Sequence, residues 1–294
     1  MKYSPEFLLT HTKSLSTGLL LALATAGCTQ DPPGPTIVDT PVEAPEPVNS
    51  EARDYAAYDQ LQWEDNFDGS SLDATKWKPE VQNVWYNNEL QATTADRSNL
   101  TVTGGNLVIT AKKEPLNGRN YTSARIVTEG LKSFNFGRID VRAKLPRGKG
   151  IWPAIWMLGS NEKQVSWPAC GEIDIMELKG SDPTTIYSTL HYGATVAEHQ
   201  IQGTAYPLPA GGNVANDYHI YSVVRSLDQI RWYVDGVLYY TRTPATVTPY
   251  PFNNPFYMIL NVAVGGDFDG DPDASTQFPQ QMQVDYVKYF KYKE

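Results

Sequence analysis

The sequence predicts an all-β protein: a two-sheet antiparallel β-sandwich (jelly roll) with a concave substrate cleft. From Leu61 onward, short segments of alternating apolar and polar residues are separated by Gly, Asn, Asp and Pro. Two pairs of these segments are joined by two-residue turns typical of β-hairpins. No stretch has a helical period of useful length, so many short strands favour two packed antiparallel sheets.

The hairpins are the clearest elements. Each joins two alternating segments across a tight turn: 99–103 and 106–111 across Gly104-Gly105, and 232–234 and 237–240 across Asp235-Gly236. Both dipeptides accept the positive φ angles of a primed turn. By the same alternation we expect further strands at residues 121–128, 137–145, 151–158, 172–178, 186–192, 218–225, 256–264 and 283–289.

The segment GEIDIMEL at 171–178 carries three acids among apolar residues. Successive side chains of a strand point to opposite faces, so Glu172 and Asp174 share one face while the isoleucines enter a core. Glu177 would face that core on a regular strand, where a lone charge is very costly. A β-bulge at Ile175-Met176 would insert one residue and return Glu177 to the face of the other acids.

This pattern has a chemical meaning. Two glutamates whose Cα atoms are roughly 13 Å apart on one face can bring their carboxyl groups to about 5–5.5 Å, the separation of a retaining glycosidase. One carboxylate then attacks the sugar carbon, and the other protonates the leaving oxygen and later activates water. Asp174 can share a proton with the nucleophile. The alternative is a solvated acidic edge strand or a cation site, but the apolar intervening positions favour a buried sheet.

Aromatic and polar residues near this segment are candidate sugar contacts. Trp152 and Trp156 point the same way on a strand, and indole faces stack on sugar rings; burial in the core is the alternative. Arg125 suits vicinal hydroxyls or the acid cluster, and a surface salt bridge is equally compatible. His191 could bond Asp174 or a sugar, or be structural. Three consecutive polar residues are expected first of all in a turn: Asn87, Asn88 and Glu89.

Composition limits the partners. The 294 residues carry a net charge of −9 with 24 Lys and Arg, so a nucleic-acid partner is excluded. A neutral polysaccharide is favoured over a sulfated one for the same reason. A chain of this length with 41% hydrophobic residues can bury one large core. We therefore expect a single domain of catalytic size at residues 59–294.

The N-terminal residues predict export. Residues 1–28 have basic residues, an apolar run and small residues, as in a signal peptide. The residues that follow the apolar run, Ala24-Thr25-Ala26-Gly27-Cys28, resemble a lipoprotein cleavage site and indicate lipidation of Cys28. Cleavage after Ala26 is the alternative. Residues 29–58 are a Pro-rich, acidic segment expected to be a disordered linker. Cys170 is then left without a disulfide partner and is expected to pack under the catalytic face.

Seven segments give the domain a specific resemblance over residues 61–292. They are WYNNELQ at 85–91, YTSARI at 121–126, FGRID at 136–140, GIWPAIWML at 150–158, WPACGEIDIME at 167–177, WYVDG at 232–236 and FYMILNVAVGG at 256–266. The domain resembles glycoside hydrolase family 16, specifically the bacterial laminarinases, which are endo-β-1,3-glucanases. The bulged E-x-D-x-x-E form resembles laminarinases, agarases and carrageenases, whereas lichenases carry E-x-D-x-E.

The resemblance implies residue roles. Glu172 is implied as nucleophile, Glu177 as acid/base and Asp174 as the assisting acid. Sugar contacts are implied for Asn88, Arg125, Trp152, Trp156, Trp167 and His191. No catalytic cofactor is implied. Family members often hold a structural Ca²⁺ on the convex side, which the resemblance places at Asn66, Gly105 and Asp285, although Asn66 stands where an acidic residue is common.

Together these observations predict a retaining endo-hydrolase of β-1,3-glucosidic bonds in laminarin-like β-glucans. We expect a monomer that is exported, as an outer-membrane or cell-surface lipoprotein or in secreted form, and that meets a membrane only through its lipid. Two alternatives remain open. One is a non-catalytic β-glucan-binding module, since jelly rolls also host lectins. The other is a family 16 hydrolase of mixed-linkage glucan, agar or carrageenan.

Overall fold

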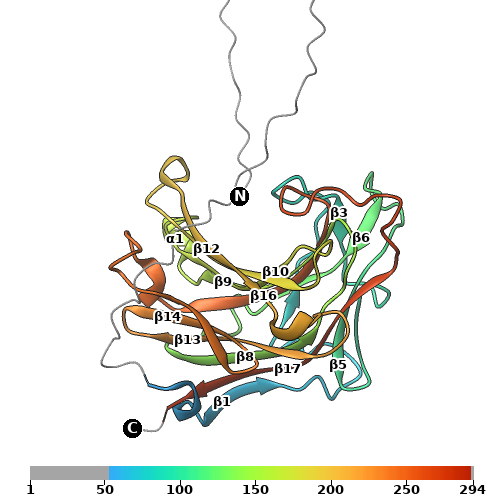
Figure 1. Ribbon diagram of the computed structural model, residues 1–294. Helices are drawn as coiled ribbons and strands as arrows, with labels where there is room; N and C mark the ends of the chain where they lie inside the picture. Colours follow the sequence, from blue (N-terminus) through green and yellow to red (C-terminus); the bar gives the residue numbers. More distant parts are fainter. Residues whose placement is uncertain (1–52, 293–294) are drawn as a thin grey trace, which may run out of the picture. The chain divides into compact units, whose positions relative to one another are not determined.

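Two antiparallel sheets pack face to face in the structure, a computed structural model that describes residues 53–292 (Figure 1). The first sheet has eight strands in the order β15-β14-β13-β8-β17-β5-β4, with β1 also on β17. Their bounds are β1 Gln60–Asp65, β4 Leu100–Thr103, β5 Asn106–Ala111, β8 Gly137–Lys144, β13 His219–Ser226, β14 Gln229–Val234, β15 Val237–Arg242 and β17 Gln280–Lys291.

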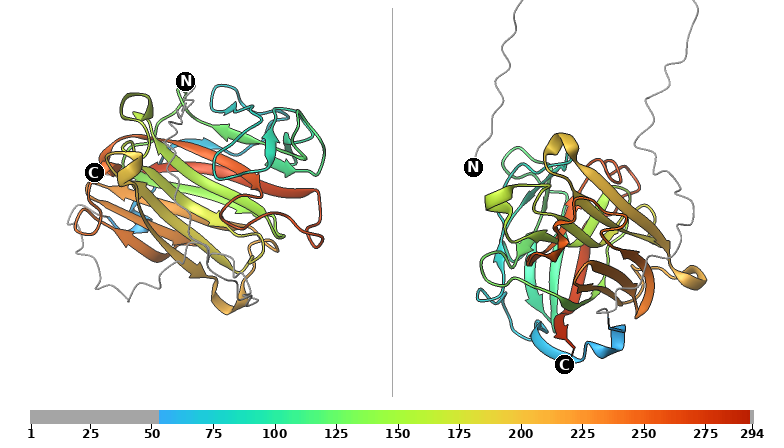
Figure 2. Two further views of the ribbon diagram at one scale, coloured as in Figure 1. Left: turned by 90° about the horizontal axis from the view of Figure 1, so that it is seen from above. Right: turned by 90° about the vertical axis from the view of Figure 1, so that its left-hand side faces the viewer.

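The second sheet has seven strands in the order β12-β11-β10-β9-β16-β7-β2. Their bounds are β2 Lys78–Pro79, β7 Arg125–Val127, β9 Ile151–Gly159, β10 Glu172–Leu178, β11 Thr185–Tyr192, β12 Gln200–Pro207 and β16 Phe256–Val264. This is the sandwich that the sequence predicts. The outer face of the second sheet curves, with β12 and the short parallel pair β3 (Gln91–Thr93) and β6 (Tyr121–Ser123) rising on either side of β10 (Figure 1), and Figure 2 looks onto it from above.

Helices are few among the described residues. There is one short α-helix, α1 (Glu162–Val165), and four 3₁₀ turns: η1 (Tyr55–Ala57), η2 (Val196–Glu198), η3 (Pro209–Gly211) and η4 (Pro251–Asn253). Within residues 53–292, no helix is both long and apolar enough to cross a membrane.

The core lies between the sheets because each strand turns alternate apolar side chains inward. On β8 these are Ile139, Val141 and Ala143, all essentially inaccessible to solvent, and they pack into one cluster with the inner residues of β10. At about 25 cal/mol per Å² of buried apolar surface, this cluster is the main source of stability. It also gives the outer face of the second sheet a rigid floor.

Both predicted hairpins are confirmed. Gly104 and Gly105 have φ angles of 59° and 71°, and Asp235 and Gly236 have 49° and 78°. The left-handed region that a primed turn requires is therefore occupied at all four positions. The single strand expected at 121–128 is wrong: it divides at the buried Ala124 into β6, which pairs with β3, and β7, which pairs with β16. Strands β1, β2, β3 and β12 were not expected.

The N-terminal predictions fall mostly outside the described residues, namely the signal peptide at 1–28, Cys28 and residues 29–52 of the linker. Residues 53–58 are described, and they correct the linker boundary. Tyr58 is 1% exposed and packs with Val224 and Tyr233, and the main-chain oxygen of Tyr55 accepts a hydrogen bond from Arg138 at 2.7 Å. The folded domain therefore starts before residue 59, because these tyrosines cover the end of the first sheet.

The three positions predicted for calcium lie close to one another beside β17. Strand β5 pairs with β17 up to Val284 and β1 from Val287 onward, so Asn66 and Gly105 lie at the ends of strands that flank Asp285. Main-chain and carboxylate oxygens suit Ca²⁺. The Asp285 carboxylate also accepts a hydrogen bond from Arg142 at 2.6 Å, so a bound ion would share that carboxylate with a cation. Because Asp285 belongs to the first sheet, such an ion would be structural, and the site stays a prediction.

Candidate active site

The β-bulge predicted in β10 is confirmed by the register of its neighbours. Asp174 lies opposite Trp156 of β9, but Met176 lies opposite Ile155 and Glu177 opposite Ala154, so one extra residue is accommodated between Asp174 and Met176. The same shift separates Asp174 and Glu177 along β11. Ile175 and Met176 are both buried. Glu177 is consequently turned to the outer face of the sheet, where Glu172 and Asp174 lie.

The bulge is held from both sides. A bulge disrupts the ladder and leaves main-chain groups that need other partners. The carbonyl of Asp174 accepts a hydrogen bond from the indole Nε1 of Trp232, which reaches across the core from the first sheet (3.0 Å). The carbonyl of Ile175 accepts one from Ser188 Oγ of β11 (2.8 Å). These two side chains fix the backbone that carries the acids.

Each glutamate has its own indole donor. Trp152 Nε1 donates to Glu177 Oε1 at 2.9 Å, and Trp167 Nε1 donates to Glu172 Oε2 at 2.8 Å. Hydrogen bonds to an ionised acceptor are stronger than neutral ones and fix the carboxylate's orientation. Trp152 comes from β9 and Trp167 from the loop before β10, so two different elements orient the two carboxylates.

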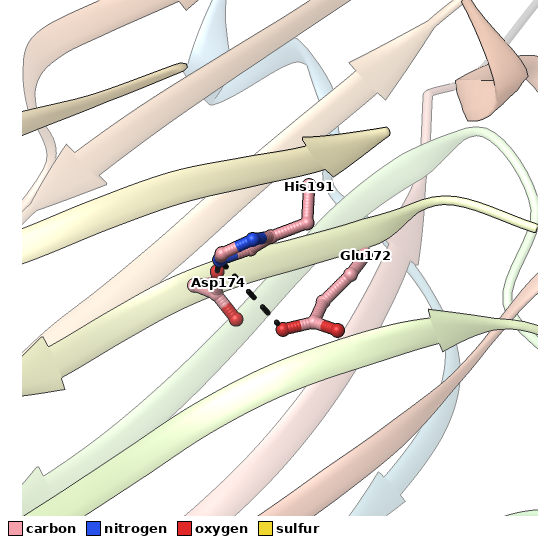
Figure 3. Close-up of side chains that lie close together, drawn as sticks. All are labelled: Glu172, Asp174 and His191. Carbon is pink, nitrogen blue, oxygen red and sulfur yellow. Dashed lines mark ion pairs between the residues drawn. The ribbon is translucent and has the colours of Figure 1, made fainter. Parts of the chain in front are cut away.

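A histidine on the neighbouring strand connects Asp174 to Glu172 (Figure 3). His191 lies opposite Glu172 in the β10–β11 register, and its Nε2 is 3.4 Å from Asp174 Oδ2 and 3.9 Å from Glu172 Oε1. His191 thus lies at ion-pair distance from Asp174, the residue to which the sequence suggested it could hydrogen-bond. The imidazole ring lies within ion-pair distance of both carboxylates, so their negative charges favour its protonated form.

The local charges and burial give the two glutamates different pKa values. Burial, and next the charge of Asp174, raises the pKa of Glu172 to about 7 and that of Glu177 to about 8. Burial lowers the pKa of His191, but the carboxylates of Glu172, Asp174 and Glu177 outweigh it and raise that pKa to about 9. Near neutral pH, Glu172 is therefore the more readily ionised glutamate, Glu177 keeps its proton, and His191 is a cation. This ordering suits a nucleophile and a general acid.

Glu172, Asp174 and His191 also have the spacing of metal ligands, since one ligand atom of each lies within 4.8 Å of the others. A cationic imidazole offers no lone pair to a metal. Because the carboxylates of Glu172, Asp174 and Glu177 raise the pKa of His191 to about 9, a metal ion at this cluster would have to displace that proton at neutral pH.

Arg125 supports an aromatic residue and does not pair with the acids. Its Nε is 2.5 Å from Glu80 Oε2, and its guanidinium lies 4.5 Å from the Trp85 ring and 4.7 Å from the Trp156 ring. The salt bridge that the sequence left open is therefore present. Trp156 is further fixed by donation from its Nε1 to Asn261 Oδ1 (2.7 Å). Trp152 and Trp156 are half-buried on the outer face, as their spacing predicts.

Asn88 lies at the rim of this face. Its Nδ2 donates to Asp267 Oδ1 at 2.8 Å, which joins the 86–89 turn to the loop after β16. Asn87 and Asn88 have φ angles of 55° and 56°, as expected of turn residues. Gly266 packs so closely here that a Cβ would be 2.8 Å from the Asn87 main-chain oxygen and 3.3 Å from the Trp152 ring. The turn is thereby held beside Trp152.

Sequence reasoning missed a wall of aromatic residues next to Glu177. The Phe268 ring is 5.0 Å from Trp152 and 5.2 Å from Tyr187, which lies opposite Glu177 on β11. The buried Asp269 anchors this loop by accepting hydrogen bonds from the Gly150 amide and from Ser181. The alternation on β11 that places His191 on the outer face could have found Tyr187. Nothing in the local pattern identifies Phe268, which belongs to a loop.

Cys170 is a free thiol that is fully buried. Burial, and next the charge of Glu162, raises its pKa to about 12, so it is not a nucleophile. It packs with Leu158 and Tyr257 below Trp167, as expected.

Comparison with known proteins agrees with this geometry. The model of glycosyl hydrolases family 16 matches residues 84–288. A beta-glucanase of Rhodothermus marinus is 41% identical over 268 residues, covering 84% of this chain and 90% of that protein. Glucan endo-1,3-beta-glucosidase A1 of Niallia circulans is 42% identical over 257 residues, which cover 79% of this chain but only 38% of that longer protein. Among solved structures, the laminarinase catalytic domain of Thermotoga maritima has 43% identity and a TM-score of 0.76, covering 80% of this chain and 99% of that one.

Proposed function

Because the chain belongs to glycosyl hydrolases family 16, we propose that it cleaves internal β-1,3-glucosidic bonds of laminarin-like β-glucans with retention of configuration. One observation carries the proposal: the bulge in β10 turns two glutamates with separately placed indole donors to one face, with Asp174 and the His191 cation beside them. The choice of β-1,3-glucan draws on what the similar proteins from Niallia circulans and Thermotoga maritima are named for.

The first step forms a glycosyl-enzyme. The ionised carboxylate of Glu172 attacks the anomeric carbon, the bond from that carbon to the leaving oxygen breaks, and Glu177 gives its proton to that oxygen. Burial keeps this proton on Glu177 near neutral pH, because it raises the pKa of the group to about 8. Donation from Trp167 holds the attacking carboxylate in place.

The second step releases the sugar. Glu177, now ionised, takes a proton from water while the water oxygen attacks the anomeric carbon and the bond to Glu172 breaks. Trp152 donates to Glu177 and so stabilises it in the ionised form that acts as base. Two inversions at one carbon give net retention. An acceptor hydroxyl in place of water gives transglycosylation from the same intermediate.

Asp174 and His191 balance charge beside the nucleophile. Asp174 disfavours ionisation of Glu172, and the His191 cation favours it. As Glu172 loses its negative charge to the sugar bond, the His191–Asp174 ion pair (3.4 Å) keeps the buried Asp174 compensated.

The test is a product profile on laminarin, lichenan, agarose and carrageenan under identical conditions. We expect the fastest release of reducing ends from laminarin among the four polysaccharides. Its early products should be oligosaccharides of several lengths, as internal cleavage requires. Proton NMR of fresh products should show the β anomer before mutarotation. Release from agarose or carrageenan alone, or an initial α anomer, would contradict the proposal.

A non-catalytic glucan-binding module is the rival function. Glu172→Gln separates the two, because the amide cannot attack the sugar carbon but keeps nearly the same shape. We expect this variant to bind laminarin in affinity electrophoresis while hydrolysis is lost. Binding by the wild-type protein without any release of sugar would favour the module.

We further propose that the protein is exported and acts as a monomer, and that Cys28 carries a lipid. The support for export and lipidation is the sequence pattern of residues 1–28 and their apolar run. Palmitate labelling of the expressed full chain should disappear in Cys28→Ser. Labelling that persists in that variant, or export without labelling in the wild type, would refute lipidation. Light scattering measures the molar mass in solution, and a mass above that of one chain would contradict the monomer.

A further inference from the structure

One residue outside the acid set contacts both partners of the nucleophile. His199 follows η2 and precedes β12, and its Nε2 is 2.9 Å from Nδ1 of His191. The two imidazole rings are nearly parallel, at 16° with centroids 5.1 Å apart. The His199 ring also lies 4.5 Å from the ring of Trp167. His191 and Trp167 are the two side chains whose N–H groups face Glu172.

When His191 is a cation, the form that the surrounding carboxylates favour, the hydrogen bond between the histidines has one arrangement of protons. Nε2 of His191 faces the carboxylates of Asp174 and Glu172 and so carries a proton. A cationic His191 also carries a proton on Nδ1, which must be donated to a lone pair on His199 Nε2. His199 is therefore neutral, with its own proton on Nδ1. Burial, and next the positive charge of His191, lowers the pKa of His199, which keeps that lone pair available.

We propose that His199 is a positioning residue for the nucleophile: its Nε2 lone pair fixes the ring of His191, and its ring packs against Trp167, which donates to Glu172. This inference rests on the proposed hydrolysis and adds a residue to it. His199 lies behind His191, so it acts on the carboxylate through its two neighbours.

The surroundings of His199 favour this role. The charged group that faces its ring from β11 is His191, whose other ring nitrogen, Nε2, faces the carboxylates of Glu172 and Asp174 on β10. Glu198, on the same turn, has its carboxylate hydrogen-bonded to Thr195 Oγ1 at 3.0 Å. The turn itself is tightly packed, because a Cβ on Gly193 would lie 2.5 Å from the Glu198 main-chain oxygen and 3.1 Å from the His199 Cα. The backbone thus sets where the ring lies.

Two substitutions separate the hydrogen bond from the packing. His199→Phe keeps a ring against Trp167 but has no acceptor, whereas His199→Gln keeps an acceptor oxygen near the Nε2 position. Without the acceptor the cationic form of His191 is less stable, so the Glu172 carboxylate loses part of its compensating charge and its pKa rises. The acid limb of the pH profile of kcat/KM on laminarin should therefore move to higher pH in His199→Phe. Relative to wild type, kcat should fall roughly tenfold and KM should stay within about twofold.

We expect His199→Gln to restore the acid limb to within a few tenths of a pH unit of wild type. Gln200→Ala is the matched control, since Gln200 is the next residue and is exposed. It should leave both kcat and the limb unchanged. Melting temperatures and circular dichroism verify that each variant is folded. An unchanged acid limb in folded His199→Phe, or the same limb shift in the Gln and Phe variants, overturns the proposal.

NMR of ¹⁵N-histidine tests the same bond without turnover. The chain has four histidines, so assignment by substitution is direct. In the wild type His191 should titrate well above neutral pH and show a slowly exchanging ring N–H at Nδ1. His199→Phe should lose that signal and lower the titration midpoint of His191; an unaltered midpoint refutes the proposal. If laminarin is not cleaved by the wild type while this NMR result holds, the proposed function fails and the positioning of His191 stands.

Discussion

The two indole donors lead to a paired prediction. Trp152→Phe and Trp167→Phe each keep an aromatic ring and remove one N–H from one glutamate. Both hydrogen bonds favour the ionised form of their glutamate, so removing either raises the pKa of that group only. A hydrogen bond to a charged group contributes about 1.5–3 kcal/mol, and 1.36 kcal/mol corresponds to one pKa unit. Both indoles are half-buried and water replaces part of the loss, so we expect shifts of about one unit.

The two variants should change the pH profile in opposite ways. In the wild type, Glu172 must be ionised and Glu177 protonated, so the kcat/KM profile falls below about pH 7 and above about pH 8. Raising the pKa of Glu177 in Trp152→Phe moves the alkaline limb upward and widens the bell. Raising the pKa of Glu172 in Trp167→Phe moves the acid limb upward, which narrows the bell and lowers its maximum.

The assay is initial-rate hydrolysis of soluble laminarin from pH 5 to 10 at constant ionic strength. The positions of the limbs are compared, because either substitution can also change sugar binding and hence the height of the profile. Circular dichroism over the same pH range verifies folding. If Trp152→Phe moved the acid limb and Trp167→Phe the alkaline one, the roles of Glu172 and Glu177 would be reversed. If neither limb moved, the indole hydrogen bonds would have no part in setting these pKa values.

Three further changes are expected to have measurable effects. Glu172→Gln should lower kcat on laminarin by about 10³-fold or more without altering the fold, and near-wild-type turnover would remove this residue from its role. Glu177→Gln should raise the melting temperature by a few degrees at pH 9 but hardly at pH 4.5, because a carboxyl whose pKa rises from 4.5 to about 8 on folding costs stability as the pH climbs between these values; equal gains at both pH values would contradict this. Arg225→Met should lower the free energy of unfolding in urea by about 3 kcal/mol, since the fully buried guanidinium donates to three main-chain carbonyls, and of these the Phe134 carbonyl keeps the Phe256 amide as a partner whereas those of Phe252 and Asn254 lose their donor; a loss below about 1 kcal/mol would mean that water replaces the guanidinium.

Strand alternation was enough to predict the centre of the site. A charge at Glu177 is incompatible with the core position that a regular strand would give it, so the sequence itself requires the bulge that the register confirms. The turn dipeptides Gly104-Gly105 and Asp235-Gly236 fixed both hairpins in the same local way. Each of these features is decided within a few residues, and that is why a single sequence was sufficient.

Features that depend on distant partners could not be predicted. Arg125 forms a salt bridge with Glu80, which is 45 residues away in the sequence, and its position near the rings of Trp85 and Trp156 follows from the assembled sheet. The 121–128 segment has an unbroken strand pattern, yet its two halves lie in different sheets, since 121–123 pairs with β3 and 125–127 with β16. His199 and Phe268 were missed because loop backbones, without a period, set their positions.

The difference between the two glutamates is also a property of the fold. Both come from β10, and each accepts one indole N–H, so sequence and hydrogen bonding alone make them nearly equivalent. The His191 cation lowers the pKa of both glutamates, but β11 places it directly opposite Glu172 and 3.9 Å from its carboxylate. The charge of Arg125 also lowers the pKa of Glu172, whereas the charge of Glu172 raises that of Glu177. Opposite Glu177 the same strand places Tyr187, which carries no charge at neutral pH. The cation directly opposite Glu172, the further charge of Arg125 and the charge of Glu172 itself acting on Glu177 favour ionisation of Glu172 first. Charges from β7, β10 and β11 thus distinguish nucleophile from acid, once the bulge has put both glutamates on one face.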